Sequence, residues 1–401
     1  MQSIRELYKI GHGPSSSHTL APERACHLFT KLYGTFPYYE VELYGSLSLT
    51  GQGHRTDKVI MESLPGDCII AFCDDWNESF PNGFYLKAFD ANHQLVHKWT
   101  VFSLGGGSIQ VKEYDLDWDE EVYHESSFKE IESYLTKNSK SFYDYVNEHE
   151  VKLDKFLKRI LDAELACVEN GLKADGYLPG KLKMKRSAKE LYEQSNKLEG
   201  SEKERMRLMA YAYAASEENG AGNTCVTAPT LGACGVMASL LYYYAKDKKA
   251  SEKDLIHALA VGGVIGNLIK TNATISGAVG GCQAEIGAAV SMASAACAYL
   301  EGLPISQIEY AAEIGMEHNL GLTCDPVMGY VMIPCIERNA MGILRAVDAA
   351  LLSKHMSQVK EHLVSFDMVV NTMNETGKQI PISLKETAQG GLAKEFLQKD
   401  E

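Results

Sequence analysis

The fold of the second half of the chain follows from the segment Ala284-Glu-Ile-Gly-Ala-Ala-Val-Ser-Met-Ala-Ser-Ala-Ala-Cys-Ala-Tyr-Leu300. Small and apolar residues fill almost every position, so the segment predicts a helix that is buried and closely packed on all sides. It contains Glu285 and is followed by Glu301, and it is too short to cross a bilayer. We therefore expect a core helix of a globular domain.

Segments of the same Ala-, Gly- and Met-rich character lie on both sides, at 233–245, 253–269 and 336–353. Together they predict an almost all-helical domain over residues 151–401. Upstream, from about 115 to 208, Glu, Lys and Tyr recur at helical spacing and predict amphipathic helices joining the two halves. These helices are expected to break at Gly171, at the turn 176–180 and at Gly200.

The first 150 residues have a different pattern. Apolar and polar residues alternate at 38–45 and 83–90, and a turn at Asp90-Ala-Asn-His-Gln leads into a further run at 95–102. This alternation predicts strands and a hairpin, closed by Gly105-Gly-Gly. We expect an α/β domain over residues 1–150, and therefore an α+β chain overall.

Composition limits the class of function. The chain has 401 residues, of which 45% are hydrophobic and 23% charged, which predicts two globular domains. A net charge of −14 disfavours nucleic acids and anionic membranes as partners. The N-terminus lacks the pattern of a signal peptide, so we expect a cytoplasmic protein. Its ten cysteines are then more often core thiols, ligands or nucleophiles than disulfides.

Three of the cysteines lie in turns. Cys282 follows Gly-Gly, Cys324 precedes Asp-Pro and Cys335 follows a proline, whereas the other cysteines considered, Cys26, Cys167 and Cys297, lie within helical apolar patterns. Three thiolates without a fourth partner can hold a metal centre and leave one coordination position for chemistry. The long spacing fits neither the usual structural zinc site nor a dense ferredoxin motif, and buried structural thiols are the alternative.

Two loops of the first domain carry candidate site residues. In Gly11-His-Gly-Pro-Ser-Ser-Ser-His-Thr, the hydroxyls and amides of Ser15, Ser16, Ser17 and His18 suit a carboxylate or phosphate, although a capped surface loop has the same composition. In Thr50-Gly-Gln-Gly-His-Arg-Thr-Asp, glycines flank Gln52 and bring His54 close to any ligand. A histidine can exchange a proton near neutral pH, but a solvent-exposed loop histidine is the alternative.

The helical domain contains polar turns in an apolar background. Glu218-Asn-Gly-Ala-Gly-Asn-Thr-Cys-Val-Thr includes Asn219 and Thr227, and Lys270-Thr-Asn-Ala-Thr-Ile-Ser-Gly begins with Lys270. Buried polar residues need partners, which a bound polar ligand or helix capping can provide.

These motifs follow one order along the chain. They are Gly13-Pro-Ser-Ser-Ser-His-Thr, Gly51-Gln-Gly-His-Arg-Thr-Asp, Gly105-Gly-Gly, Val226-Thr-Ala-Pro-Thr, Ser276-Gly-Ala, Cys282-Gln-Ala-Glu, Ala311-Ala-Glu-Ile-Gly-Met-Glu-His-Asn-Leu-Gly-Leu-Thr-Cys-Asp-Pro-Val and Pro334-Cys-Ile-Glu-Arg-Asn-Ala-Met-Gly. Together they resemble the iron-sulfur L-serine dehydratases over nearly the whole chain, with the β-type domain fused ahead of the α-type domain.

The resemblance implies a [4Fe-4S] cluster held by Cys282, Cys324 and Cys335, with one iron open to substrate. It implies deamination of L-serine to pyruvate and ammonia by β-elimination of water, in the cytoplasm, within amino-acid catabolism and gluconeogenesis. His54 is the expected base and His18 the alternative. Ser15, Ser16, Ser17 and His18 are expected to hold the substrate carboxylate, with Asn219, Thr227 and Lys270 as further contacts to the amino acid.

The family pattern also makes a homodimer the expected assembly. Members often have Glu, Asn and Gly where this chain has Thr271, Leu231 and Arg55, and these departures concern the substrate more than the reaction. Two alternatives therefore stay open. One is a related β-eliminase acting on cysteine or another β-substituted amino acid, and the other is a non-catalytic metal-binding or regulatory protein whose thiols hold zinc or nothing.

Overall fold

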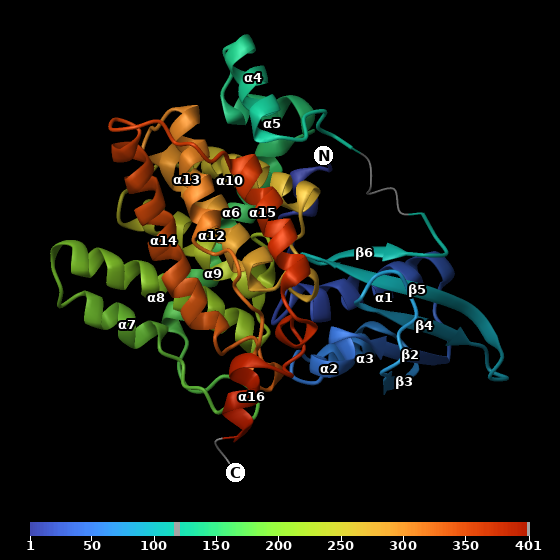
Figure 1. The fold of residues 1–401 in the computed structure, drawn as a ribbon. Coiled ribbons are helices and arrows are strands. Elements are labelled where there is room, and N and C mark those ends of the chain that lie inside the picture. Colours follow the sequence, from blue (N-terminus) through green and yellow to red (C-terminus); the bar gives the residue numbers. More distant parts are fainter. Residues whose placement is uncertain (116–120, 399–401) are drawn as a thin grey trace.

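The computed structural model describes residues 1–115 and 121–398 and places an α/β part beside a larger helical body (Figure 1). The predicted fold class, an α/β region followed by a mostly helical one, is confirmed. None of the helices in the described residues combines the length and apolarity that crossing a membrane requires.

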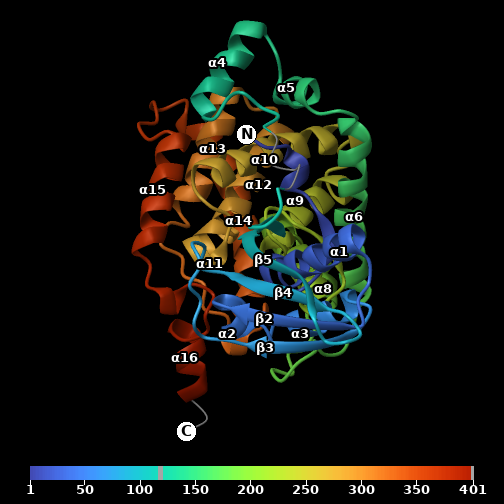
Figure 2. The ribbon, with the colours of Figure 1, turned by 90° about the vertical axis from the view of Figure 1, so that its right-hand side faces the viewer.

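The α/β part is built on a five-stranded sheet of order β3-β2-β4-β5-β6, in which only β2 and β3 run parallel. The strands are β2 Tyr38–Tyr44, β3 Asp67–Phe72, β4 Gly83–Phe89, β5 Leu95–Gly105 and β6 Ser108–Val111, and the helices of this part are α1 Ala21–Tyr33, α2 Ser46–Thr50 and α3 Thr56–Ser63. Figure 2 shows the sheet with its strands side by side. The predicted strands at 38–45, 83–90 and 95–102 correspond to β2, β4 and β5, whereas β3 and β6 were not predicted.

The helical body surrounds α12, whose residues from Ile286 to Ala298 are all buried, as the opening segment predicts. Helices α9, α10, α13 and α14 pack around it. The bounds are α4 Phe128–Asn138, α5 Phe142–His149, α6 Leu153–Lys173, α7 Ala188–Ser195, α8 Gly200–Ala221, α9 Cys234–Lys246, α10 Glu252–Asn272, α11 Gly277–Gly280, α12 Ile286–Leu300, α13 Ile305–Glu317, α14 Cys335–Met356, α15 Phe366–Gln379 and α16 Gly391–Gln398.

The first residues of the chain belong to the core of the helical body. Met1, Ile4, Leu7 and Tyr8 are buried there, and β1 (Ile10–His12) pairs antiparallel with β7 (Thr224–Val226). The core of the α/β part comprises buried residues between 21 and 111. Residues 1–12 therefore pack with the helical body. The predicted domain boundary near residue 150 stays a prediction.

One predicted helix break is wrong. Helix α6 continues through Gly171 to Lys173, because this glycine lies directly against the backbone of α8. A Cβ atom at Gly171 would lie 2.2 Å from the carbonyl oxygen of Ala214. The glycine therefore permits a close helix crossing. The predicted breaks at 176–180 and Gly200 do separate α6, α7 and α8.

Replacing Gly171 with alanine should destabilise the protein, because a backbone oxygen cannot rotate away from the new methyl group. We expect the free energy of unfolding in urea to fall by about 1–3 kcal/mol. Gly220→Ala in α8 is the matched control, since the nearest atom to its Cβ would be 3.6 Å away. That variant should be unchanged or more stable by up to about 1 kcal/mol. Equal stability of Gly171→Ala and the native chain would contradict the close crossing.

A buried lysine in the N-terminal segment makes the stability of the protein depend on pH. The Nζ of Lys9 donates to Ser108 Oγ at 3.2 Å and pairs with Glu6 at 3.4 Å, and burial lowers the pKa of Lys9 to about 7. The unfolded chain binds more protons than the folded one between this value and the ordinary lysine pKa near 10.5. Stability should therefore rise with pH across that window.

In Lys9→Met this contribution should disappear. We expect the native chain to gain stability relative to Lys9→Met between pH 7 and pH 10, by at most about 1.4 kcal/mol per pH unit. Urea unfolding at several pH values measures the difference, with the exposed Lys137→Met as the control. Parallel stability profiles of the native chain and Lys9→Met would refute the depressed pKa.

Candidate active site

The structure brings the three turn cysteines to one cavity. Cys282 lies in the turn just before α12, Cys335 is the first residue of α14, and Cys324 lies in the loop between α13 and α14. All three line the same cavity, together with His54 and Ser15 of the α/β part. Two of the three sulfurs are thus placed near helix N-termini, where the helix dipole favours negative charge.

Neighbouring groups distinguish one of the thiols. A hydrogen bond with Cys324, and the guanidinium of Arg338, lower the pKa of Cys282 to about 6. The same hydrogen bond, with burial, raises the pKa of Cys324, and burial raises that of Cys335. Arg338 is itself held by a hydrogen bond from Nη1 to the carbonyl oxygen of Thr323 at 2.6 Å. The site therefore favours anionic sulfur at Cys282.

The distances between the three cysteine sulfurs limit the kind of metal group that they can bind. Within the described part of the chain, His18, His54 and Glu386 form the one set of three possible ligand residues whose ligand atoms all lie within 4.8 Å of one another. The three cysteine sulfurs are therefore more widely spread than that. A single zinc ion, with thiolates at about 2.3 Å, would need them less than about 4 Å apart. The three thiols therefore suit a cluster of several metal ions better than they suit a single zinc ion.

The serine loop forms a second wall of the site. Ser15 caps a helical turn over Ser16–Leu20, and its Oγ accepts the backbone N–H of His18 at 3.3 Å. Ser16 Oγ accepts the N–H of Leu231 at 2.7 Å, so the loop is fastened to the helical body. The side chains of residues 15–18 are all buried. The alternative of a solvent-exposed loop is therefore wrong.

His54 presents one nitrogen as an acceptor. Its Nδ1 lies 2.9 Å from the carbonyl oxygen of Thr50, which can only accept, so Nδ1 carries the proton and Nε2 keeps its lone pair. Burial lowers the pKa of His54 to about 4, and the ring is neutral at pH 7. It is only 1% exposed, so the alternative of a solvent-exposed histidine is wrong here as well.

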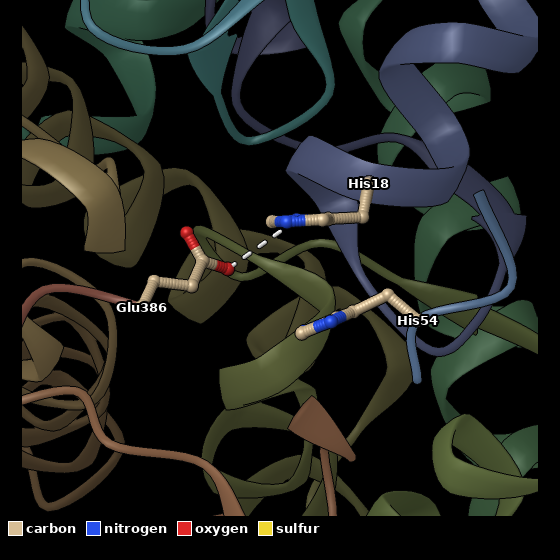
Figure 3. Close-up of side chains that lie close together, drawn as sticks. All are labelled: His18, His54 and Glu386. Atoms are coloured by element: carbon tan, nitrogen blue, oxygen red, sulfur yellow. Dashed lines mark ion pairs between the residues drawn. The ribbon is translucent and has the colours of Figure 1, made fainter. Parts of the chain in front are cut away.

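His18 stacks on His54, with ring centroids 4.1 Å apart (Figure 3). Both of its ring nitrogens have protein partners. Nε2 lies 3.0 Å from the carbonyl oxygen of Ser46, and Nδ1 lies 2.8 Å from Ser17 Oγ. A cation bound by His18, His54 and Glu386 would have to replace one of these hydrogen bonds, so the set is better suited to orienting side chains than to holding an ion.

Glu386 was missed by sequence reasoning. It lies in a turn before α16, where Oε1 accepts from Ser17 Oγ at 3.2 Å and lies 3.5 Å from His18 Nδ1 (Figure 3). Burial raises the pKa of Glu386 to about 7. Its sequence signal is weak: a charged residue in the polar, glycine-containing stretch Lys385-Glu-Thr-Ala-Gln-Gly-Gly, far from every other motif. Glu285, in the opening segment, lines the cavity too.

Besides Ser16, Ser17 and His18 of the serine loop, three candidate residues of the helical body lie outside the cavity lining. Asn219 donates from Nδ2 to the carbonyl oxygen of Pro14 at 2.7 Å and so supports the serine loop. Thr227 donates to the carbonyl oxygen of Leu7 at 2.6 Å, and Lys270 donates to Gln2 Oε1 at 2.7 Å. These contacts hold the N-terminal segment, and a direct role in substrate binding stays a prediction for all three.

Two family models match successive parts of the chain. The family model described as serine dehydratase beta chain matches residues 3–69, and the one described as serine dehydratase alpha chain matches residues 108–393. The chain belongs to the serine dehydratase family. In this family member, the beta-chain match contributes Ser15, His18 and His54 to the site, and the alpha-chain match contributes the cysteines and Glu386.

Individual relatives extend the similarity to the whole length. The chain is 36% identical to a protein named L-serine dehydratase 2 from Escherichia coli, covering 100% of both chains. It is 37% identical to an L-serine dehydratase from Streptomyces coelicolor and 36% identical to one from Helicobacter pylori, each over 98% of both chains.

The loop that carries His54 rests on the loop that carries Cys324. A Cβ atom at Gly53 would lie 2.6 Å from the carbonyl oxygen of Gly329, so only glycine permits this approach. Gly53→Ala should move His54 away from the cysteines and lower the free energy of unfolding by about 1–3 kcal/mol. Hydrogen exchange at the ring carbon of His54, followed by mass spectrometry, should become faster. The exposed Gln52→Ala is the control, and unchanged exchange in Gly53→Ala would contradict the contact.

Proposed function

We propose that this member of the serine dehydratase family deaminates L-serine to pyruvate and ammonia, with a [4Fe-4S] cluster held by Cys282, Cys324 and Cys335. One observation carries the proposal. A neutral histidine with an accepting nitrogen and three thiols from separate elements line a single cavity, in a chain that matches proteins named L-serine dehydratase over its whole length.

The cysteines suit the cluster by their number and by their place around one cavity. When bound, such a cluster supplies an iron without a protein ligand, which acts as a Lewis acid toward a hydroxyl group. Arg338 offsets part of the negative charge of the thiolates, since its guanidinium interacts with Cys282 and is held close to it by the carbonyl oxygen of Thr323.

His54 is the proposed base. Its neutral ring can accept the α-proton at Nε2, and the carbonyl oxygen of Thr50 at Nδ1 both orients the ring and stabilises the imidazolium that forms. The two nitrogens of His18 are already hydrogen-bonded, which favours a positioning role for this second histidine. Its stacking on His54 keeps both rings away from water.

The serine loop is the proposed site for the substrate carboxylate. Ser15 lies on the cavity wall, and its hydroxyl is part of a chain that continues through Ser17 to His18. Removal of the α-proton and departure of the β-hydroxyl as water leave 2-aminoacrylate. That enamine tautomerises to an imine, which water hydrolyses to pyruvate and ammonia.

The decisive experiment measures the iron and sulfide content of the protein and compares its activity on three amino acids. Protein prepared without oxygen should contain iron and sulfide, and it should release pyruvate from L-serine faster than pyruvate from L-cysteine or 2-oxobutanoate from L-threonine. Faster elimination from cysteine would instead identify a cysteine β-eliminase. Colourless protein without iron, inactive on all three amino acids, would identify a non-catalytic protein.

We also propose that the protein is a homodimer in the cytoplasm. Helix α14 exposes apolar side chains at Met341, Leu351 and Leu352, which a second copy can cover. Light scattering coupled to size exclusion should give twice the mass of 44.2 kDa.

Replacing His54 tests the proposed base. We expect His54→Asn to lower kcat for serine by about 10²-fold or more, because the proton acceptor is lost. The visible absorption and the iron content should stay as in the native protein. The exposed His93→Asn is the matched control and should keep full activity. Native turnover by His54→Asn would remove this residue from the role.

A further inference from the structure

Acidic side chains outnumber basic ones in the lining of the cavity. Its lining includes the carboxylates of Glu285 and Glu386, and neither lysine nor arginine is among the lining residues, all of which are described. Glu285 Oε2 lies 3.7 Å from the sulfur of Cys324. Glu386 has its Oε1 occupied by Ser17. The remaining oxygen, Oε2 of Glu386, is buried and accepts no hydrogen bond of normal geometry, although the backbone N–H of Ala278 also interacts with this carboxylate.

A donor from outside the protein would satisfy this acceptor. Leaving a carboxylate oxygen buried without a partner costs free energy, and Glu386 is only 4% exposed. An amino acid offers a carboxylate, a side chain and an ammonium group. Of these, only the ammonium is cationic and consists of donors alone.

We propose that Glu386 binds the α-ammonium group of the amino-acid substrate through Oε2. This inference rests on the proposed deamination of an amino acid and names the contact by which the site recognises that class of molecule. The serine loop would then hold the carboxylate, while Glu386 holds the second charged group on the same carbon.

The relation to His54 supports the assignment. Nitrogen atoms of His18 and His54 and a carboxylate oxygen of Glu386 all lie within 4.8 Å of one another. The ammonium nitrogen and the α-proton are attached to the same carbon atom. Because the carboxylate of Glu386 lies near the ring of His54 (Figure 3), an ammonium bound there would bring the α-proton toward that ring.

The backbone holds Glu386 in place from both halves of the molecule. Its N–H donates to the carbonyl oxygen of Cys324 at 2.7 Å, and its carbonyl oxygen accepts from Ser46 Oγ at 2.7 Å. Its φ of 59° lies in the left-handed region, which is disfavoured for a non-glycine residue. The surrounding contacts thus keep a disfavoured conformation that directs this side chain into the site.

The contact predicts discrimination between amino acids and hydroxy acids. L-Alanine and L-lactate differ only in an ammonium against a hydroxyl, and neither has a β-leaving group, so both can be studied at equilibrium. Calorimetry on anaerobically prepared holoprotein should show tighter binding of L-alanine. In Glu386→Gln, the affinity for L-alanine should fall at least tenfold, and that for L-lactate should change less than twofold.

Two further variants separate charge recognition from structural damage. Glu386→Asp keeps a carboxylate and should recover part of the preference for L-alanine, whereas Glu285→Gln should leave the preference intact. Iron content and circular dichroism establish that each variant is folded and loaded. The inference fails if the native protein does not prefer L-alanine, if Glu386→Gln weakens both ligands equally, or if Glu285→Gln abolishes the preference.

Pyruvate release from L-serine is measured separately on the native protein. A native protein that prefers L-alanine through Glu386 but releases no pyruvate would support the ammonium contact and refute the proposed reaction. A native protein that deaminates serine, together with a Glu386→Gln variant that loses both ligands alike, would keep the reaction and overturn the contact.

Discussion

Backbone pairing between β1 and β7 is the constraint on which the site depends. Residues Ile10–His12 are hydrogen-bonded to Thr224–Val226, so the serine loop that follows β1 begins at a fixed point on the helical body. Ser16 and Pro14 then bond to Leu231 and Asn219 of that body. The pairing gives the serine loop and His18 a defined position relative to the cysteines.

A second connection comes from the other end of the described chain. The turn at Glu386 contacts Cys324 through its backbone and Ser17 through its side chain, and Ser46 bonds to its carbonyl oxygen. Segments from the start, the middle and the end of the sequence therefore meet around one cavity. Buried polar groups are more stable when each has a partner, and Oε2 of Glu386, which lacks a hydrogen bond of normal geometry beside the two histidines, is the feature that points to a ligand.

Sequence reasoning succeeded where a local pattern has a local cause. Small apolar residues from 284 to 300 predicted the buried helix α12, and alternation at 38–45 predicted β2, because side-chain period reflects which face is buried. Glycine was harder to interpret. At Gly171 it permits contact with the α8 backbone, a cause that lies 43 residues away at Ala214 and leaves no trace in the local pattern.

The sequence by itself determined the fold class and the family, and it singled out the three turn cysteines and His54 as candidates for the chemistry. Only the tertiary structure decided which of them share a cavity, which nitrogen of His54 accepts, and that Glu386 belongs with them. The physical reason is that the shared cavity and the place of Glu386 arise from contacts between segments far apart in the sequence, and that the hydrogen bond from His54 to Thr50 forms only in the folded loop. Burial and hydrogen-bond partners, which set protonation and orientation, exist only after those segments have packed together.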